Sequence, residues 1–137
     1  MKNKEFARLY TADGEGLSGQ PWDVYPRPQM ARDSFLNLNG DWAFGVDASP
    51  LPPDELPLTI RVPFAPESIL SGVEQVFAED LYRYYKTTFT LPDGFLKERV
   101  LLHFGAVDQE TTVWVNGQEL TTHSGSGRGY SCRSSPI

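Results

Sequence analysis

Residues 99–117, RVLLHFGAVDQETTVWVNG, constrain the fold of this 137-residue chain more than any other stretch. Apolar or β-branched residues occupy every second position in both halves, a pattern typical of half-buried β-strands. They are Val100, Leu102 and Phe104 in the first half and Thr111, Val113 and Val115 in the second. Asn116-Gly117 then predicts a two-residue type I′ hairpin turn, because both residue types tolerate the positive φ that this turn needs. We expect the return strand at 118–122.

The rest of the chain has the pattern of short strands joined by turns. Further strands are expected at 42–46, 58–62 and 82–91, where aromatic and β-branched residues lie between turn residues. Residues 66–72, PESILSG, predict one helical turn that ends at its glycine. Eleven prolines and twelve glycines suit such a chain better than long helices would. The sequence therefore predicts an all-β fold, an antiparallel β-sandwich.

Three regions differ in composition. Residues 1–30 are mostly polar and end in a proline-rich segment, which predicts an extended N-terminal arm. Residues 31–125 hold the predicted strands and form the sandwich domain. Residues 126–137 are rich in serine and glycine and offer little to bury, which predicts a disordered tail.

Charge and cysteine content exclude several classes of function. The net charge of −6 argues against a nucleic-acid binder or an anionic-membrane binder, since both need a basic surface. One cysteine, Cys132, cannot form an internal disulfide or a zinc site. No apolar run is long enough to span a membrane, and the first residues lack the apolar core of a signal peptide. We expect a cytoplasmic protein without cofactor or metal.

No catalytic residue is expected. A glycosidase needs two rigidly spaced carboxyl groups, one of them partly buried. The acidic candidates lie in polar or proline-rich loops, some as adjacent pairs, and meet neither condition. They are Asp54, Glu55, Glu67, Glu79, Asp80, Asp108 and Glu110. Of the two histidines, His103 and His123, the first is expected as a partly exposed strand residue or a core histidine with satisfied hydrogen bonds, since no partner spacing of a metal site accompanies it.

Aromatic side chains leave two interpretations open, because strand aromatics form cores and exposed ones stack on sugar rings. Core positions are expected for Trp42, Phe44, Phe89 and Trp114. Both interpretations remain for Tyr82, Tyr84 and Tyr85, which follow a charged loop.

Five motifs occur in the same order, and with similar gaps, as in one enzyme family. They are PRPQ at 26–29, LNGDWAF at 38–44, IRVPFAPES at 60–68, YYKTTF at 84–89 and FGAVDQETTVWVNG at 104–117. Over residues 8–125 the chain thus resembles the N-terminal part of glycoside hydrolase family 2, which includes β-galactosidases, β-glucuronidases and β-mannosidases.

The resemblance implies a non-catalytic sugar-binding domain, a jelly-roll sandwich similar to galactose-binding domains. Both catalytic glutamates of the family lie in a later (β/α)₈ barrel that is missing from this chain, so the chain alone should hydrolyse nothing. In the parent enzyme the reaction would be retaining hydrolysis of a β-glycoside. The loop 71–83 is expected nearest the carbohydrate, with Glu79, Asp80 and Arg83 as its contacts.

The family pattern ends abruptly at the C-terminal side. Its His-x-Gly-Gly-Tyr run is matched by His123-Ser124-Gly125, and nothing matches from Ser126 onward. We therefore expect a sandwich that is incomplete at its C-terminus, through a frameshift, a truncated gene or an assembly error. Two alternatives to a glycosidase fragment stay open: a free-standing carbohydrate-binding module, and a structural domain that completes a separate catalytic chain.

Overall fold

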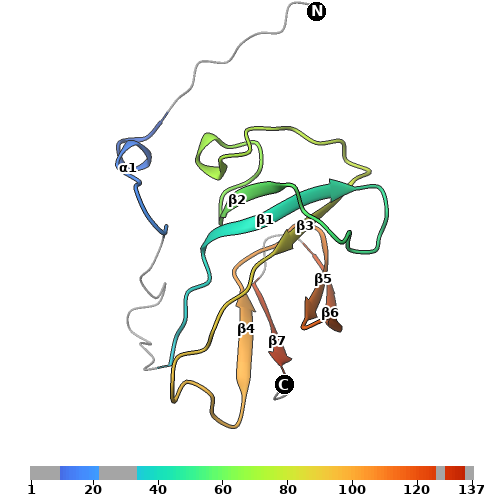
Figure 1. The fold of residues 1–137 in the computed structure, drawn as a ribbon. Helices are drawn as coiled ribbons and strands as arrows, with labels where there is room; N and C mark the ends of the chain where they lie inside the picture. Colours follow the sequence, from blue (N-terminus) through green and yellow to red (C-terminus); the bar gives the residue numbers. More distant parts are fainter. Residues whose placement is uncertain (1–9, 22–33, 126–128, 135–137) are drawn as a thin grey trace, which may run out of the picture. The chain divides into compact units, whose positions relative to one another are not determined.

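The structure, a computed structural model, describes residues 10–21, 34–125 and 129–134. The chain divides into two compact units, Met1–Phe89 and Thr90–Ile137 (Figure 1). The described residues form seven strands, all in antiparallel sheets, with one single-turn α-helix. This confirms the predicted all-β antiparallel class and is consistent with a β-sandwich. Neither described helical segment is long and apolar enough to cross a membrane.

The first unit is built on a three-stranded sheet. Its central strand β1 (Gly40–Asp47) lies between β2 (Leu58–Val62) and β3 (Tyr82–Lys86), and both pairings are antiparallel (Figure 1). Phe44 and Ile60 are fully buried. They lie on the same face, since Ile60 is the register partner of Trp42, two residues before Phe44. The core of this unit therefore lies on the face that the alternating pattern of β1 predicted.

The opposite face of this sheet is covered by the loop that follows β1. A Cβ atom on Gly45 would lie 2.9 Å from Leu56 Cδ2, so the loop approaches the sheet closely there. Tyr84, the register partner of Gly45, is buried, and its hydroxyl group donates a hydrogen bond to the carbonyl oxygen of Ser49. Polar contacts of this loop therefore help to hold it against the sheet.

The predicted helical turn is confirmed as a 3₁₀ turn, η2 (Ile69–Ser71). The Ser68 side chain caps its start, and Gly72 ends it with a φ of 78°. The buried Ser71 hydroxyl lies 2.7 Å from the Ser68 carbonyl oxygen and accepts a hydrogen bond from the Val73 amide at 3.0 Å. The Ser71 side chain therefore stabilises the turn through hydrogen bonds to the backbone on either side of it.

The second unit holds two antiparallel pairs. Strand β5 (Glu110–Val115) pairs with β6 (Gln118–Ser124), and the turn between them has φ values of 49° at Asn116 and 79° at Gly117. Both positive values confirm the predicted type I′ hairpin. Strand β4 (Val100–Phe104) pairs with β7 (Tyr130–Ser134).

The presence of β7 differs from the expected disordered tail. Tyr130 and Cys132, two residues apart, face into this unit: Tyr130 stacks on Phe104 with ring centroids 4.8 Å apart, and Cys132 is buried. Tyr130 and Cys132 are spaced as residues on one face of a strand, but the low average hydrophobicity of the segment led to the prediction of disorder. Residues 126–128 and 135–137 of the predicted tail lie outside the described residues, and the predicted 31–125 boundary stays a prediction.

Other expectations were wrong in part. Residues 12–15 of the predicted extended arm form α1 (Ala12–Glu15), a single turn capped by Thr11, while 1–9 and 22–33 lie outside the described residues. The strand predicted at 82–91 ends at Lys86, where its ladder with β1 ends. Phe89 and Trp114, expected in the core, are 49% and 37% exposed. Phe89 lies beyond the end of β3, and Trp114 lies on the face of β5 opposite to that of the buried Val113.

Candidate functional site

The three predicted sugar contacts lie at the start of β3. Glu79 and Asp80 are the central residues of a turn closed by the Leu81 amide, which donates to the Ala78 carbonyl oxygen at 3.3 Å. Arg83 is the second residue of β3 and lies opposite Val46. All three side chains are exposed. No hydrogen bond or ion pair links them to one another, although all three lie in the described part of the chain.

The structure adds Tyr85 and Glu67 to this surface. Arg83 and Tyr85 are two residues apart on β3 and therefore share a face. Burial raises the pKa of Tyr85, the Arg83 guanidinium lowers it, and the Glu67 carboxylate raises it. The charges of Arg83 and Glu67 therefore both act on the Tyr85 hydroxyl group. The alternation of side chains along β3 could have pointed to Tyr85, whereas Glu67 comes from a distant segment with no sequence signal for this interaction.

The structure separates the three tyrosines that the sequence left open. Tyr84 is a core residue, and burial raises the pKa of its hydroxyl. Tyr82 and Tyr85 are 50% and 41% exposed, on opposite faces of the strand. Only exposed rings can stack on a sugar. Stacking on a sugar therefore remains possible for Tyr82 and Tyr85 and is excluded for Tyr84.

A second feature of the first unit is an open groove of about 670 Å³. Residues of the 10–17 segment, β1, β2 and η2 line it. An adjoining hollow of about 300 Å³ runs along residues 18–20 to the start of β1. Asp41 and Arg61 line both hollows, which are therefore neighbours, and we call the two together the Asp41–Arg61 groove.

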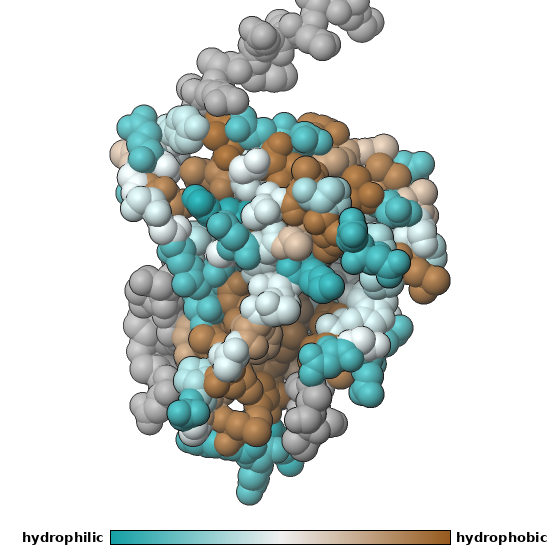
Figure 2. Space-filling view, in the orientation of Figure 1, coloured by the Kyte–Doolittle hydropathy of each residue, from teal (hydrophilic) through white to brown (hydrophobic). Residues whose placement is uncertain are grey.

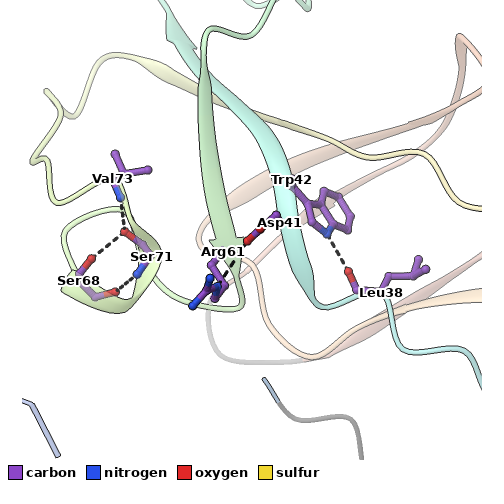
Figure 3. A network of polar contacts seen from close by, with 7 residues as sticks. All are labelled: Leu38, Asp41, Trp42, Arg61, Ser68, Ser71 and Val73. Carbon is purple, nitrogen blue, oxygen red and sulfur yellow. Dashed lines mark hydrogen bonds and ion pairs between the residues drawn. The ribbon is translucent and has the colours of Figure 1, made fainter. Parts of the chain in front are cut away.

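The ion pair at the centre of the groove is a direct cross-strand contact. Asp41 of β1 and Arg61 of β2 are register partners, and Arg61 Nε lies 3.4 Å from Asp41 Oδ1 (Figure 3). The two side chains are 64% and 35% exposed, respectively. An exposed pair with one contact contributes little to stability. The polar atoms of Asp41 and Arg61 that this pair does not use can therefore bind a ligand with little loss of folding stability.

The second unit has an uncommon cluster of unpaired polar atoms. Thr111 Oγ1, His123 Nε2 and Tyr130 Oη are shielded from solvent and have no hydrogen-bond partner among the described residues. The His123 ring stacks on Tyr130 with centroids 4.2 Å apart, so β6 contacts β7 through these rings. His103 lies on β4 and pairs through Nδ1 with the Ser131 hydroxyl. His103 is a strand residue, as predicted, and His123 lies on β6. The described residues contain no cluster of three side chains suited to hold a metal ion.

Polar and apolar residues are mixed on the visible face of the molecule (Figure 2). Several large apolar side chains of the described part stay exposed, among them Leu51, Val76, Tyr82 and Leu96. Surface of this kind is ordinary for soluble proteins, and it does not single out either candidate site.

The chain is similar to a known protein over about three quarters of its length. No family model matches the chain. The chain is 26% identical over 111 residues to a beta-glucuronidase of Paenibacillus borealis. The match covers 74% of this chain and 18% of that protein, so the chain spans less than a fifth of its relative. Together with the antiparallel all-β architecture, this similarity supports a domain related to glycoside hydrolases.

Proposed function

We propose that this chain is a non-catalytic sugar-binding region of a family 2 glycoside hydrolase, equivalent to the N-terminal domain of such enzymes. The observation that carries the proposal is the similarity to a beta-glucuronidase over 74% of the chain. The order of the five family motifs in the sequence and the antiparallel sheets are consistent with it.

The proposed contacts with carbohydrate are Glu79, Asp80 and Arg83, with Tyr85 on the same face of β3 as Arg83 and Tyr82 on the opposite face. Exposed carboxylate and guanidinium groups exchange hydrogen bonds with sugar hydroxyls, and an exposed tyrosine ring offers a stacking surface. These side chains would position a β-glycoside for a reaction carried out elsewhere in the enzyme. Glu79 and Asp80 lie exposed in a turn, whereas a catalytic acid needs partial burial, so binding is the role that their surroundings favour.

Two measurements on the full chain test this function. The first is hydrolysis of nitrophenyl β-galactoside, β-glucuronide and β-mannoside, for which we expect no turnover. The second is calorimetric titration with the same sugars as methyl glycosides. Saturable binding without turnover would support a non-catalytic sugar-binding role, either in a domain of a larger glycosidase or in the alternative of a free-standing carbohydrate-binding module, and no binding of any of these sugars would contradict that role. Turnover that survives purification would contradict a non-catalytic role.

Substitution then tests the proposed contacts. Glu79→Gln and Arg83→Gln keep side-chain size and remove charge, so they should weaken sugar binding without unfolding the chain. Asp93→Asn, in an exposed turn of the second unit, is the matched control. Equal effects of all three variants would contradict the assignment of the β3 surface. Stable co-purification with a separate catalytic chain would instead favour the structural-domain alternative.

A further inference from the structure

We infer that the Asp41–Arg61 groove is a second sugar subsite, specific for a neutral glycoside. The inference rests on the proposed carbohydrate-binding function but concerns other residues than the β3 surface. The groove has its floor on β1 and β2 and its walls on the 10–20 segment and η2. With about 670 Å³ in its main part, it has the size of small-molecule pockets in proteins.

The walls of the groove are held by their own hydrogen bonds. Thr11 Oγ1 accepts from the Gly14 amide at 3.1 Å and caps α1. Gln20 Nε2 donates to the Asn37 carbonyl oxygen at 3.2 Å, and Asn39 Nδ2 donates to that of Pro21 at 3.3 Å. These contacts tie the N-terminal segment to the residues just before β1. On the other wall, the Ser71 network fixes η2 (Figure 3). Because these hydrogen bonds already order the residues of both walls, the protein loses little conformational entropy when a ligand binds.

The polar groups of the floor match the hydroxyl groups of a sugar. An arginine has five N–H donors in a rigid fork, and the contact with Asp41 uses only Nε. Asp41 engages Arg61 through Oδ1, which leaves Oδ2 as an acceptor. Adjacent sugar hydroxyls can each donate to a carboxylate oxygen and accept from a guanidinium N–H. The cross-strand register of β1 and β2 keeps the two side chains adjacent for this purpose.

The apolar part of the groove suits the C–H face of a sugar ring. Tyr10 is 44% exposed and lines the groove together with Leu17, Ile69 and Leu70. An aromatic ring beside hydrogen-bonding groups binds an amphipathic ligand better than either kind of group alone. This mixed lining favours a carbohydrate over a purely polar ion.

The charge of the lining selects among carbohydrates. Among the described lining residues, Glu15 and Asp41 carry negative charge and Arg61 carries the only positive charge. Because Asp41 also partly neutralises Arg61, an added carboxylate or phosphate would meet net repulsion. The groove should therefore prefer a neutral glycoside to a glucuronide.

Nuclear magnetic resonance of the ¹⁵N-labelled full chain tests this site, with methyl β-galactoside and methyl β-glucuronide as probes at millimolar concentration. We expect the neutral sugar to shift amide resonances around the groove and the glucuronide to shift them less. Arg61→Gln should weaken binding of the neutral sugar at the groove at least about tenfold, which corresponds to losing one charge-assisted contact. Arg83→Gln on β3 is the matched control and should leave the groove shifts unchanged.

A second variant tests the charge argument. Asp41→Asn keeps the size of the side chain and removes one negative charge, so it should narrow the preference for the neutral sugar over the glucuronide. The Trp42 indole N–H, which donates to the Leu38 carbonyl oxygen at 2.7 Å, reports whether each variant remains folded.

The outcomes separate the subsite from the proposed function. Shifts confined to the β3 surface, lost in Arg83→Gln and kept in Arg61→Gln, would overturn the subsite and leave the sugar-binding function standing. Equal groove shifts with both sugars in the unsubstituted chain would overturn the specificity. No shift with any sugar would contradict the sugar-binding function itself.

Discussion

Phe44 of β1 and Tyr85 of β3 face each other across the antiparallel ladder, with ring centroids 5.0 Å apart and ring planes inclined by 58°. Phe77 packs edge-on against Phe44 from the loop before β3, at 5.7 Å. Phe44 is fully buried, whereas Tyr85 is partly exposed. This contact therefore joins the core of the first unit to the surface proposed to bind sugar.

Replacement of Phe44 should destabilise the first unit strongly. Phe44→Ala removes a buried ring and leaves a cavity between β1, β3 and Phe77, which typically costs about 3–5 kcal/mol. Urea unfolding followed by tryptophan fluorescence measures the change. Phe89→Ala is the matched control, because that ring is 49% exposed, and it should cost less than about 1 kcal/mol. Similar losses for both variants would show that Phe44 is not the core of the unit.

A methyl group at Gly45 should conflict with Leu56. The added Cβ would lie 2.9 Å from Leu56 Cδ2, so the leucine must move, at a cost of about 1–3 kcal/mol. Because the clash is with the end of a side chain, Leu56→Ala in the same molecule should recover part of this loss. A double-mutant cycle measures the coupling, which should be at least about 0.5 kcal/mol. Gly19→Ala, with no atom within 4 Å of the new Cβ, serves as control, and additive effects of Gly45→Ala and Leu56→Ala would refute the contact.

Alkaline pH should destabilise the first unit through Tyr84. Burial raises the pKa of its hydroxyl above the ordinary value of 10.0, so the folded state keeps a proton that the unfolded state releases. The contribution of Tyr84 to stability is therefore complete below pH 10 and is lost as the pH rises through the folded-state pKa. Urea unfolding at a series of pH values should show this fall.

Tyr84→Phe should make the fall above pH 10 shallower and lower the stability at neutral pH by about 0.5–1.5 kcal/mol, through loss of the hydrogen bond to Ser49. Tyr82→Phe, an exposed tyrosine on the same strand, is the control. If the stability of Tyr84→Phe fell as steeply above pH 10 as that of the unsubstituted chain, groups other than Tyr84 would be responsible for the fall.

Local patterns were enough to predict much of the fold. The aromatic and β-branched residues that predicted β1 and β2 and the Asn116-Gly117 turn depend only on neighbouring residues, and the structure confirms both strands and the turn. The partner of β4 could not be predicted, because its strand β7 begins 26 residues after Phe104 and has a composition typical of loops. Strand pairing at such a distance depends on side chains that meet only after folding, such as Phe104 and Tyr130.

The candidate sites show the same limit. Polarity alone pointed to Glu79 and Asp80, and both are exposed. The pairing of Asp41 with Arg61 joins residues 20 positions apart and exists only in the observed register of β1 and β2. A shift of that register by one residue would turn one of the two side chains to the other face. Prediction of this pair would therefore have required the register, which the sequence pattern alone did not specify.

Cys132 offers a direct test of strand β7. Its side chain is 6% exposed, and Sγ lies 3.8 Å from the carbonyl oxygen of its register partner Leu102. Burial raises the pKa of the thiol above 9.0, so little reactive thiolate forms at neutral pH. A thiol reagent should therefore label the native chain at least about tenfold more slowly than the urea-unfolded chain, because labelling requires local opening of β7.

Phe104→Ala should increase the labelling rate of Cys132, since it removes the ring on which Tyr130 stacks and weakens the β4–β7 pair. Trp114→Ala removes an exposed ring of β5 and should leave the rate unchanged. Mass spectrometry of quenched samples measures both rates on the single cysteine of the chain. Native labelling as fast as unfolded labelling would mean that residues 130–134 are disordered in solution, as their composition first indicated, and that β4 lacks this partner.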